Sequence, residues 1–149
     1  VYSPYLKELF FAHKNIGSFK INNITSIDEF KLSEKINLSK SIAPKAFTIV
    51  VSRSHMNQKT NQFIYDIKSK YNNVSKIAYG SSLKLCRVAE GKAHCYPRFG
   101  PTMEWDTAAA DAVATFAGCK LFSVETKKEL IYNKNNLLNP FFILKRSHV

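Results

Sequence analysis

The sequence is poor in acidic residues. Its 149 residues include 11 Asp and Glu against 22 Lys and Arg, a formal net charge of +11. No loop of paired carboxylates occurs among these acids. Magnesium ions that bridge a phosphate are held by several oxygen ligands gathered in one place. The sequence therefore predicts no complete metal site of this kind within the chain.

Cysteine pairs and long apolar runs are also missing. Cys86, Cys95 and Cys119 are odd in number and form no Cys-x-x-Cys motif, which favours reduced, intracellular thiols over disulfides or a zinc site. The chain has no run of about 18 apolar residues, so we expect no transmembrane segment. The chain begins at Val1, inside a predicted strand. We therefore expect more protein upstream and conclude nothing from the missing signal peptide.

The excess of positive charge raises nucleic-acid binding as an alternative function. The lysines are dispersed along the whole chain, however, and no nucleic-acid-binding motif is present. We expect no nucleic-acid partner. A non-catalytic nucleotide- or nucleic-acid-binding module stays open as the alternative of a different class.

Strand and helix patterns alternate from residue 46 onward and predict an α/β fold. Residues 47–51 form a continuous apolar run typical of a buried parallel strand. Helices are expected at residues 57–71, 83–89 and 103–117, and further strands at residues 76–79, 93–99, 120–124 and 140–144. We expect a mixed β-sheet flanked by helices, with ligands at the strand ends.

The first 45 residues have a different pattern. Strands are expected at residues 1–5, 9–12 and 16–21, and a polar surface excursion or hairpin at residues 22–44. We therefore divide the chain into residues 1–45, strands plus a polar excursion, and residues 46–149, a C-terminal α/β domain.

Gly80-Ser81-Ser82 follows a short apolar run and precedes a helical pattern, which indicates a strand-to-helix turn. Glycine lets the backbone approach a ligand, the serines can cap the helix, and N–H groups at a helix start attract anions. Lys84 lies near the same face, where its ammonium can neutralise a phosphate. The plainer alternatives are a Ser-capped turn and a solvated surface lysine.

Small residues follow Asp106 at helical spacing. Asp106, Ala109, Ala110, Val113 and Ala117 form one stripe, so we expect the Asp106 carboxylate to face inward. A buried carboxylate needs a cation or hydrogen-bond donors. The alternative is an acid that stays in solvent and stabilises the helix dipole.

Several motifs together resemble one family. The sequence WDTAAADAV at residues 105–113, with Gly118 downstream, is similar to the C-terminal signature of the inositol monophosphatase superfamily of Mg²⁺-dependent phosphatases. SRSH at 52–55, GSSLK at 80–84, VAEGKA at 88–93 and YPRFGPT at 96–102 resemble its 3′(2′),5′-bisphosphate nucleotidase branch of CysQ type. The resemblance extends over residues 1–142 and implies the C-terminal part of the layered sugar-phosphatase fold, with residues 1–45 ending its N-terminal half.

The resemblance implies a hydrolase that uses Mg²⁺ to remove the 3′-phosphate of adenosine 3′,5′-bisphosphate, giving AMP and phosphate. The family has a Glu motif and an Asp-Pro-x-Asp-Gly-Thr motif upstream, and both supply metal ligands. Neither motif occurs in this chain. We therefore expect an incomplete fragment that is weakly active or inactive by itself.

The resemblance also implies the site residues. Asp106 would bind metal and lie near the reacting phosphate, and the predicted substrate-binding set comprises His55, Gly80, Ser81, Ser82, Lys84, Arg98 and Asp106. Inositol monophosphatases typically carry a Glu near Arg98 that addresses ring hydroxyls, whereas a guanidinium suits a second phosphate. An arginine extending from a strand edge into solvent is the plainer alternative. An inositol monophosphatase or a fructose-1,6-bisphosphatase-like sugar phosphatase is the nearest rival.

Three departures from the pattern of the relatives are Ala110 in place of Gly, Cys119 in place of Gly or Ala, and His94 where Asp is frequent. We expect all three to be tolerated, with Ala110 narrowing the site. A cytoplasmic location is expected, with peripheral attachment to the inner face of the membrane left open, as is a homodimer.

Overall fold

The N-terminal strands form an antiparallel sheet. The computed structural model describes residues 1–26, 28, 30–31, 34–53 and 56–147. The strands of this sheet, which pair in chain order, are β1 (Tyr2–Ser3), β2 (Glu8–His13), β3 (Gly17–Asn22) and β4 (Ile36–Asn37). The turn into β3 contains Gly17 with φ +97°, a conformation that glycine adopts without steric penalty. A short 3₁₀ helix at Leu38–Lys40 leads out of the sheet.

The second sheet is mixed, as predicted. Its strands are β5 (Phe47–Ser52), β6 (Val74–Tyr79), β7 (Cys95–Arg98), β8 (Cys119–Ser123) and β9 (Phe142–Arg146). They lie in the order β6-β5-β7-β9-β8. β5 is parallel to β6 and β7, whereas β9 is antiparallel to β7 and β8. The parallel strands therefore bring their carboxyl ends to the same edge of the sheet.

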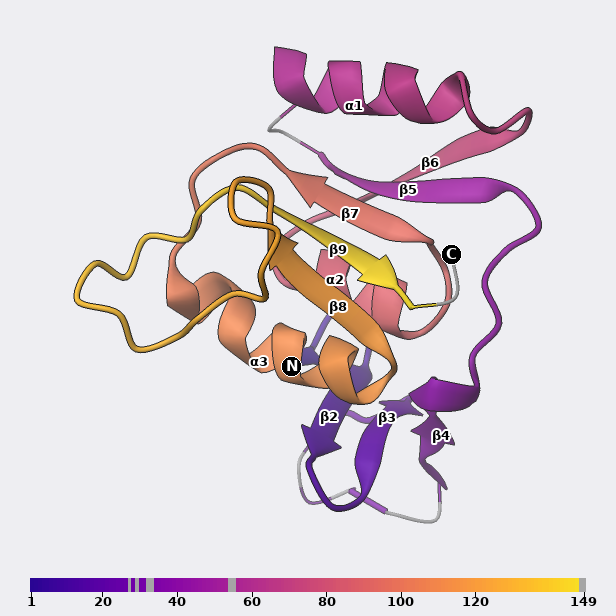
Figure 1. Cartoon of the computed structure of the whole chain (residues 1–149). Coiled ribbons are helices and arrows are strands. Elements are labelled where there is room, and N and C mark those ends of the chain that lie inside the picture. The colour runs from indigo at the N-terminus through magenta and orange to yellow at the C-terminus, as the bar shows by residue number, and fades with distance from the viewer. Residues whose placement is uncertain (27, 29, 32–33, 54–55, 148–149) are drawn as a thin grey trace.

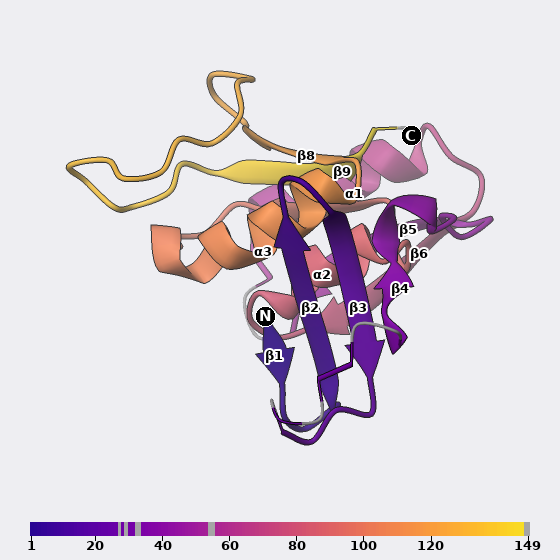
Figure 2. The same ribbon diagram turned by 90° about the horizontal axis from the view of Figure 1, so that it is seen from below.

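Three helices complete four layers (Figure 1). The helices are α1 (Gln58–Lys68), α2 (Leu83–Ala89) and α3 (Glu104–Phe116). α1 covers one face of the five-stranded sheet, and α2 and α3 lie between the two sheets, as the view from below also shows (Figure 2). Side chains alternate along β5, so Val50 packs with the α2–α3 layer while Ile49 packs with Ile64 of α1.

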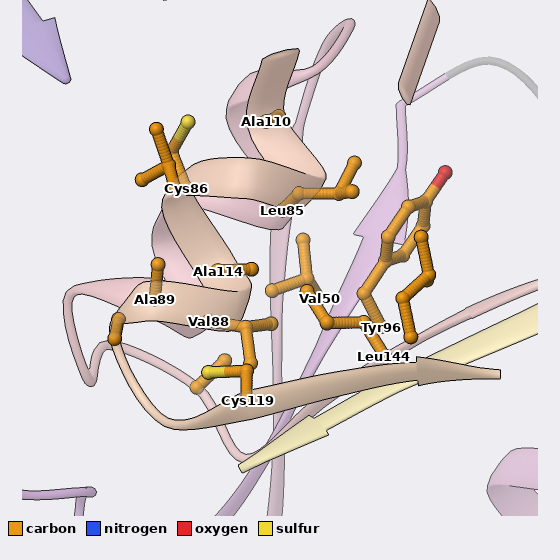
Figure 3. Packing of buried hydrophobic residues seen from close by; sticks show 14 of the residues in the cluster. Val50, Leu85, Cys86, Val88, Ala89, Tyr96, Ala110, Ala114, Cys119 and Leu144 are labelled. Carbon is orange, nitrogen blue, oxygen red and sulfur yellow. The ribbon is translucent and has the colours of Figure 1, made fainter. Parts of the chain in front are cut away.

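The helix layer and both sheets share one hydrophobic core. Phe10 of β2 belongs to the same cluster as Leu85 of α2, Ala114 of α3 and Leu144 of β9. Ala110 and Ala114 are fully buried, and their small side chains let α3 lie close to α2 (Figure 3). This core contains residues from both sides of position 45. The division of the chain at residue 45 stays a prediction.

All three cysteines are free and buried. Burial raises the pKa of the Cys86 and Cys95 thiols to about 12 and that of Cys119 to about 11. The thiols therefore stay protonated at neutral pH. Within the described residues, no helix is both long and apolar enough to span a membrane.

Four charged residues, of which Lys20 and Arg87 are buried and Glu8 and Glu90 are partly buried, connect the N-terminal sheet to α2. Lys20 of β3 contacts Glu8 of β2 at 2.5 Å and Glu90, which follows α2, at 2.8 Å. Arg87 of α2 contacts Glu8 at 2.6 Å and also pairs with Glu90. The Arg87 guanidinium lies 4.5 Å from the centre of the Tyr79 ring. Two cations and two carboxylates thus neutralise one another inside the protein, where an unpaired charge would be costly.

Candidate functional site

A polar cavity of about 220 Å³ lies at the carboxyl ends of β5, β6 and β7. Ligands commonly bind at this edge of an open α/β sheet. The N-terminal turn of α3 forms the opposite wall. The residues lining the cavity are Ser52, Arg53, Gly80, Ser81, Ser82, Lys84, Leu85, Tyr96, Arg98, Pro101, Thr102, Asp106, Thr107 and Phe142. Every residue of the predicted set except His55 is among them.

The Gly80 turn joins β6 to α2 at the cavity. Ser81 has φ +49°, a left-handed conformation that is uncommon for residues other than glycine. Ser82 is the N-cap residue of α2, but its side chain makes no capping hydrogen bond. The expectation that the serines cap the helix through their side chains is therefore wrong for Ser82. Its side chain therefore does not cap the helix, and the residue lines the cavity.

Lys84 places a buried cation in the cavity wall. The residue is 6% exposed, and its Nζ donates to the Ser81 carbonyl at 2.7 Å. Its Nζ also lies 5.4 Å from the centre of the Tyr96 ring. Burial, helped by the charge of Arg98 and opposed by Asp106, lowers the pKa of Lys84 to about 8. The alternative of a solvated surface lysine is therefore wrong.

Two arginines add to the positive charge. Arg98, at the end of β7, is half-buried, and its Nη2 donates to the Pro101 carbonyl at 3.0 Å. Its Nε is buried and has no hydrogen-bond partner among the described residues. Arg53 follows β5 and is exposed at the rim. Within the described part of the lining, three cations therefore face a single carboxylate.

That carboxylate is Asp106, in the first turn of α3. Its Oδ2 accepts a hydrogen bond from the Met103 backbone N–H at 2.8 Å. Asp106 and Ala109 are exposed, whereas Thr107, Ala110, Val113 and Ala114 face the core. The expectation that Asp106 lies inward on a buried stripe is therefore wrong. Its side chain opens instead into the cavity that also contains the Gly80 turn.

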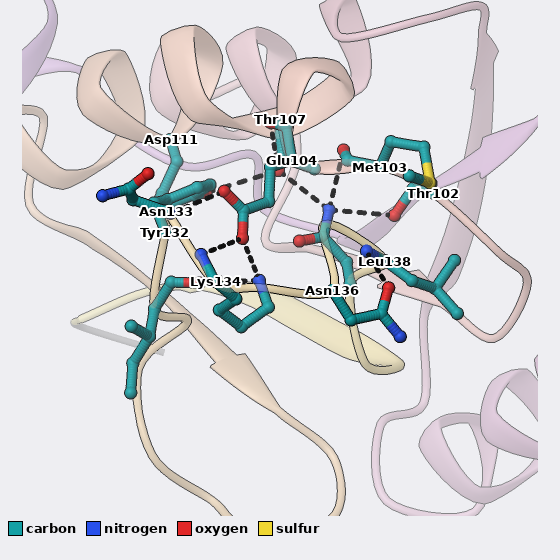
Figure 4. Close-up of polar contacts among 12 residues, drawn as sticks. Thr102, Met103, Glu104, Thr107, Asp111, Tyr132, Asn133, Lys134, Asn136 and Leu138 are labelled. Atoms are coloured by element: carbon teal, nitrogen blue, oxygen red, sulfur yellow. Dashed lines mark hydrogen bonds and ion pairs between the residues drawn. The ribbon is translucent and has the colours of Figure 1, made fainter.

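A segment that follows β8 holds the N-terminal turn of α3 in place (Figure 4). Glu104 accepts hydrogen bonds from the backbone N–H groups of Asn133 and Lys134, and it pairs with the Lys134 ammonium. Tyr132 donates its hydroxyl to Asp111 at 2.8 Å. We call residues 131–139 the α3 strap, because they fasten this helix beside the cavity.

The cavity lining differs from the predicted set of site residues at several positions. His55 lies outside the described residues. Arg53, Thr102 and Thr107 line the cavity although they are not in the predicted set. Arg53 and Thr102 fall within motifs quoted above, and Thr107 directly follows Asp106. These motifs are the signal in the sequence that indicates the three further residues.

The donor set of the cavity fits magnesium only in part. Within the described residues, no group of three or more His, Cys, Asp and Glu side chains could hold a metal ion. Asp106 is the one carboxylate among the described residues that line the cavity. Magnesium often binds through one or two carboxylates, waters and substrate phosphate oxygens. Asp106 therefore fits as one ligand of a Mg²⁺ ion, but these residues do not complete a two-metal site.

Comparison with known proteins decides the family. The model of the inositol monophosphatase family matches residues 1–147. The chain belongs to this family. The resemblance found in the sequence motifs is thereby confirmed, and so is the layered α/β fold.

Family members of CysQ type are similar to this chain. The 3′(2′),5′-bisphosphate nucleotidase CysQ of Salmonella typhimurium is 33% identical over 95% of the chain and 52% of its own length. CysQ of Buchnera aphidicola is 37% identical over 81% of the chain and 40% of its own length. The crystal structure of CysQ from Bacteroides thetaiotaomicron superposes with a TM-score of 0.90 at 42% identity, covering 97% of this chain and 56% of that one. The chain thus spans about half the length of these relatives.

Proposed function

We propose that the chain forms the substrate-binding side of a Mg²⁺-dependent 3′(2′),5′-bisphosphate nucleotidase. The reaction would remove the 3′-phosphate of adenosine 3′,5′-bisphosphate to give AMP and phosphate. The observation that carries the proposal is the cavity in which Lys84 and Arg98 lie together with Asp106. The similarity to CysQ nucleotidases supports this choice of substrate.

The charge of the cavity suits a ligand with two phosphates. Lys84 offers a compact ammonium at the Gly80 turn, and Arg98 offers a planar guanidinium at the end of β7. A guanidinium can bind phosphate oxygens in pairs, whereas the hydroxyls of an inositol ring also need acceptors. We propose that Ser81 and Ser82 donate hydroxyl hydrogen bonds to the ligand, and that His55 helps to place the nucleotide. Two cations in the cavity favour a substrate with two phosphates more than the substrate of an inositol monophosphatase, which has one phosphate and several hydroxyls.

We propose Asp106 as one magnesium ligand. When bound, Mg²⁺ supplies positive charge beside the phosphoryl group that is transferred. Asp106 Oδ2 is held by the Met103 N–H, and Oδ1 has no partner among the described residues. One carboxylate cannot complete the site, so we propose that the chain by itself is weakly active or inactive. A cytoplasmic location and a homodimer stay predictions.

Calorimetric titration of the chain tests the proposal. In EDTA, adenosine 3′,5′-bisphosphate is expected to bind about tenfold more tightly than AMP or inositol 1-phosphate, because a second phosphate adds charged hydrogen bonds. Equal or tighter binding of inositol 1-phosphate or fructose 1,6-bisphosphate would favour the sugar-phosphatase alternative. Salt-sensitive binding of an oligonucleotide that persists in Asp106→Ala, without bisphosphate binding, would favour the nucleic-acid alternative.

Phosphate release tests the catalytic part of the proposal. With Mg²⁺ and adenosine 3′,5′-bisphosphate, the chain is expected to release phosphate far more slowly than CysQ of Salmonella typhimurium assayed alongside. Release at a comparable rate would contradict the proposed weak activity. It would also show that the chain holds enough metal ligands by itself.

The affinity for the bisphosphate should depend on the protonation of Lys84. The pKa of about 8 means that the ammonium is mostly charged at pH 7.5 and mostly neutral at pH 9.5. Phosphate monoesters are fully ionised over this range, since their second pKa is about 6. Binding is therefore expected to weaken about tenfold from pH 7.5 to pH 9.5. Calorimetry at both pH values measures this, and the Lys84→Met variant should show a much flatter profile. A flat profile in the unmodified chain would contradict it.

A further inference from the structure

Asn139 is a buried amide at the base of the cavity wall. The residue is 5% exposed. Its Nδ2 donates to the Met103 carbonyl at 2.9 Å, to Thr107 Oγ1 at 3.0 Å and to Thr102 Oγ1 at 3.2 Å. Its backbone N–H donates to the Thr102 carbonyl at 2.8 Å. Asn139 thus donates hydrogen bonds to four acceptor atoms in Thr102, Met103 and Thr107, at the start of α3.

These contacts lead directly to Asp106. The Thr102 carbonyl and the Met103 N–H belong to the same planar peptide, so fixing one end of this group fixes the other. The N–H end donates to Asp106 Oδ2 at 2.8 Å. The amide of Asn139 holds the next carbonyl along the chain, that of Met103. Asn139 therefore holds the two peptides that flank Met103, the first through its backbone N–H and the second through its side-chain amide. The orientation of the Asp106 carboxylate depends on Met103, and the side-chain amide is the part of this hold that a substitution removes.

We propose that Asn139 is a positioning residue that sets the direction of the Asp106 carboxylate in the cavity. Asp106 Oδ2 is directed toward the Met103 N–H, which leaves Oδ1 for a cation. The significance for catalysis rests on the proposed function, in which Asp106 binds magnesium. Residues that orient a metal ligand without touching the metal commonly change metal affinity by about 10–100-fold when they are replaced.

Anchoring the α3 strap does not by itself require an amide at this position. The strap is also fastened by the Lys134–Glu104 pair and by the Tyr132–Asp111 hydrogen bond, and neither of these reaches Met103. The Oδ1 atom of Asn139 is buried and has no hydrogen-bond partner among the described residues. An unpaired buried oxygen is unfavourable, and leucine would fill a similar volume without one. Leucine lacks the N–H donors of Nδ2, so Asn139→Leu removes the side-chain hydrogen bonds while it keeps a similar volume.

The test compares Asn139→Leu with Lys134→Met, a matched change that removes another anchor of the strap. NMR spectra of the full chain report the Met103 amide directly. Asn139→Leu is expected to shift this amide proton and speed its exchange with solvent by at least about tenfold, whereas Lys134→Met leaves both close to the unmodified chain. Circular dichroism confirms that each variant is folded. If Asn139→Leu does not fold, Asn139→Ala takes its place.

Metal binding provides the functional readout. Trp105 is the single tryptophan of the chain, is 67% exposed and precedes Asp106, so its fluorescence can report Mg²⁺ binding there. With adenosine 3′,5′-bisphosphate present throughout to supply phosphate oxygens as further ligands, Asn139→Leu is expected to weaken Mg²⁺ binding about tenfold, with no further loss when added to Asp106→Asn. An equal loss in Lys134→Met, or an unchanged Met103 amide in Asn139→Leu, would overturn the positioning role. Absence of Mg²⁺ binding in the unmodified chain would instead contradict the proposed metal role of Asp106, and the amide result would still decide the role of Asn139.

Discussion

Replacing Arg87 with methionine is expected to lower the free energy of unfolding by about 3–5 kcal/mol. The Arg87 side chain is 2% exposed and pairs with both Glu8 and Glu90. Methionine fills part of the space but leaves two partly buried carboxylates with Lys20 as their main cation. Removal of one charged residue from such a cluster leaves the remaining charges without a partner in a poorly solvated place. The expected loss of stability is large for this reason.

Lys31→Met is the matched control for this prediction. Lys31 and Glu34 have the same i, i+3 spacing as Arg87 and Glu90, but they lie 3.9 Å apart with side chains 69% and 58% exposed. Solvent screens this pair, so its loss should change stability by less than about 1 kcal/mol. Urea unfolding followed by circular dichroism measures both variants. Similar small changes in the two would contradict a stabilising role for the buried cluster.

The same cluster should make the stability of the chain sensitive to acid. Burial raises the pKa of Glu8, but hydrogen bonds and charge attraction from Arg87 and Lys20 outweigh burial, so its pKa lies below the usual value. The contribution of Glu8 is therefore present above its unfolded pKa and is lost as the pH falls through its lower folded pKa. Arg87→Met should show a smaller loss over this range, because the main group that lowers the pKa is gone.

Lys84→Met is expected to weaken binding of adenosine 3′,5′-bisphosphate about 100-fold. A hydrogen bond from a charged donor contributes about 1.5–3 kcal/mol, and methionine offers neither the charge nor the donor. Calorimetry at pH 7.5, where Lys84 is mostly protonated, gives the largest difference. Lys92→Met, which removes a half-exposed lysine outside the cavity, should leave the affinity within about twofold.

The same substitution should make the folded chain more stable. Lys84 has a lowered pKa because the folded protein disfavours its charged form, so this penalty is fully present below pH 8 and disappears as the pH rises past the unfolded pKa. Methionine removes the penalty, and unfolding free energy at pH 7.5 is expected to rise by about 1 kcal/mol. Loss of both binding and stability would mean that Lys84 serves packing rather than ligand binding.

The sequence predicts the elements of the second sheet closely. The apolar run at residues 47–51 is β5, and the helical spacing at 103–117 contains α3. Both patterns arise from local periodicity, which the burial of one face imposes on the chain. The cavity lining could likewise be placed, because strands that run parallel end at one edge of the sheet.

Features that depend on distant contacts could not be predicted in this way. Arg87 and Glu8 are 79 residues apart, and nothing in the local sequence of either indicates the other. Asn139 lies in a segment without periodicity, and its partners are 32–37 residues away. The helical spacing predicts the wrong face for the Asp106 side chain, because an alanine-rich helix gives little contrast between its sides. Periodicity sets the face of a helix only where large apolar residues mark it.

The enclosure of α2 and α3 between two sheets has a consequence for how this protein can diverge. A larger side chain in either helix must be matched on two opposing surfaces, one from residues 1–45 and one from the remainder of the chain. Substitutions accumulate least readily in such a doubly covered layer, whereas lengthening is best absorbed in the largely exposed connection at residues 124–138. We therefore expect the distance between α2 and α3, which carry Lys84 and Asp106, to change little during evolution. The sequences and lengths of the surface loops are expected to change more.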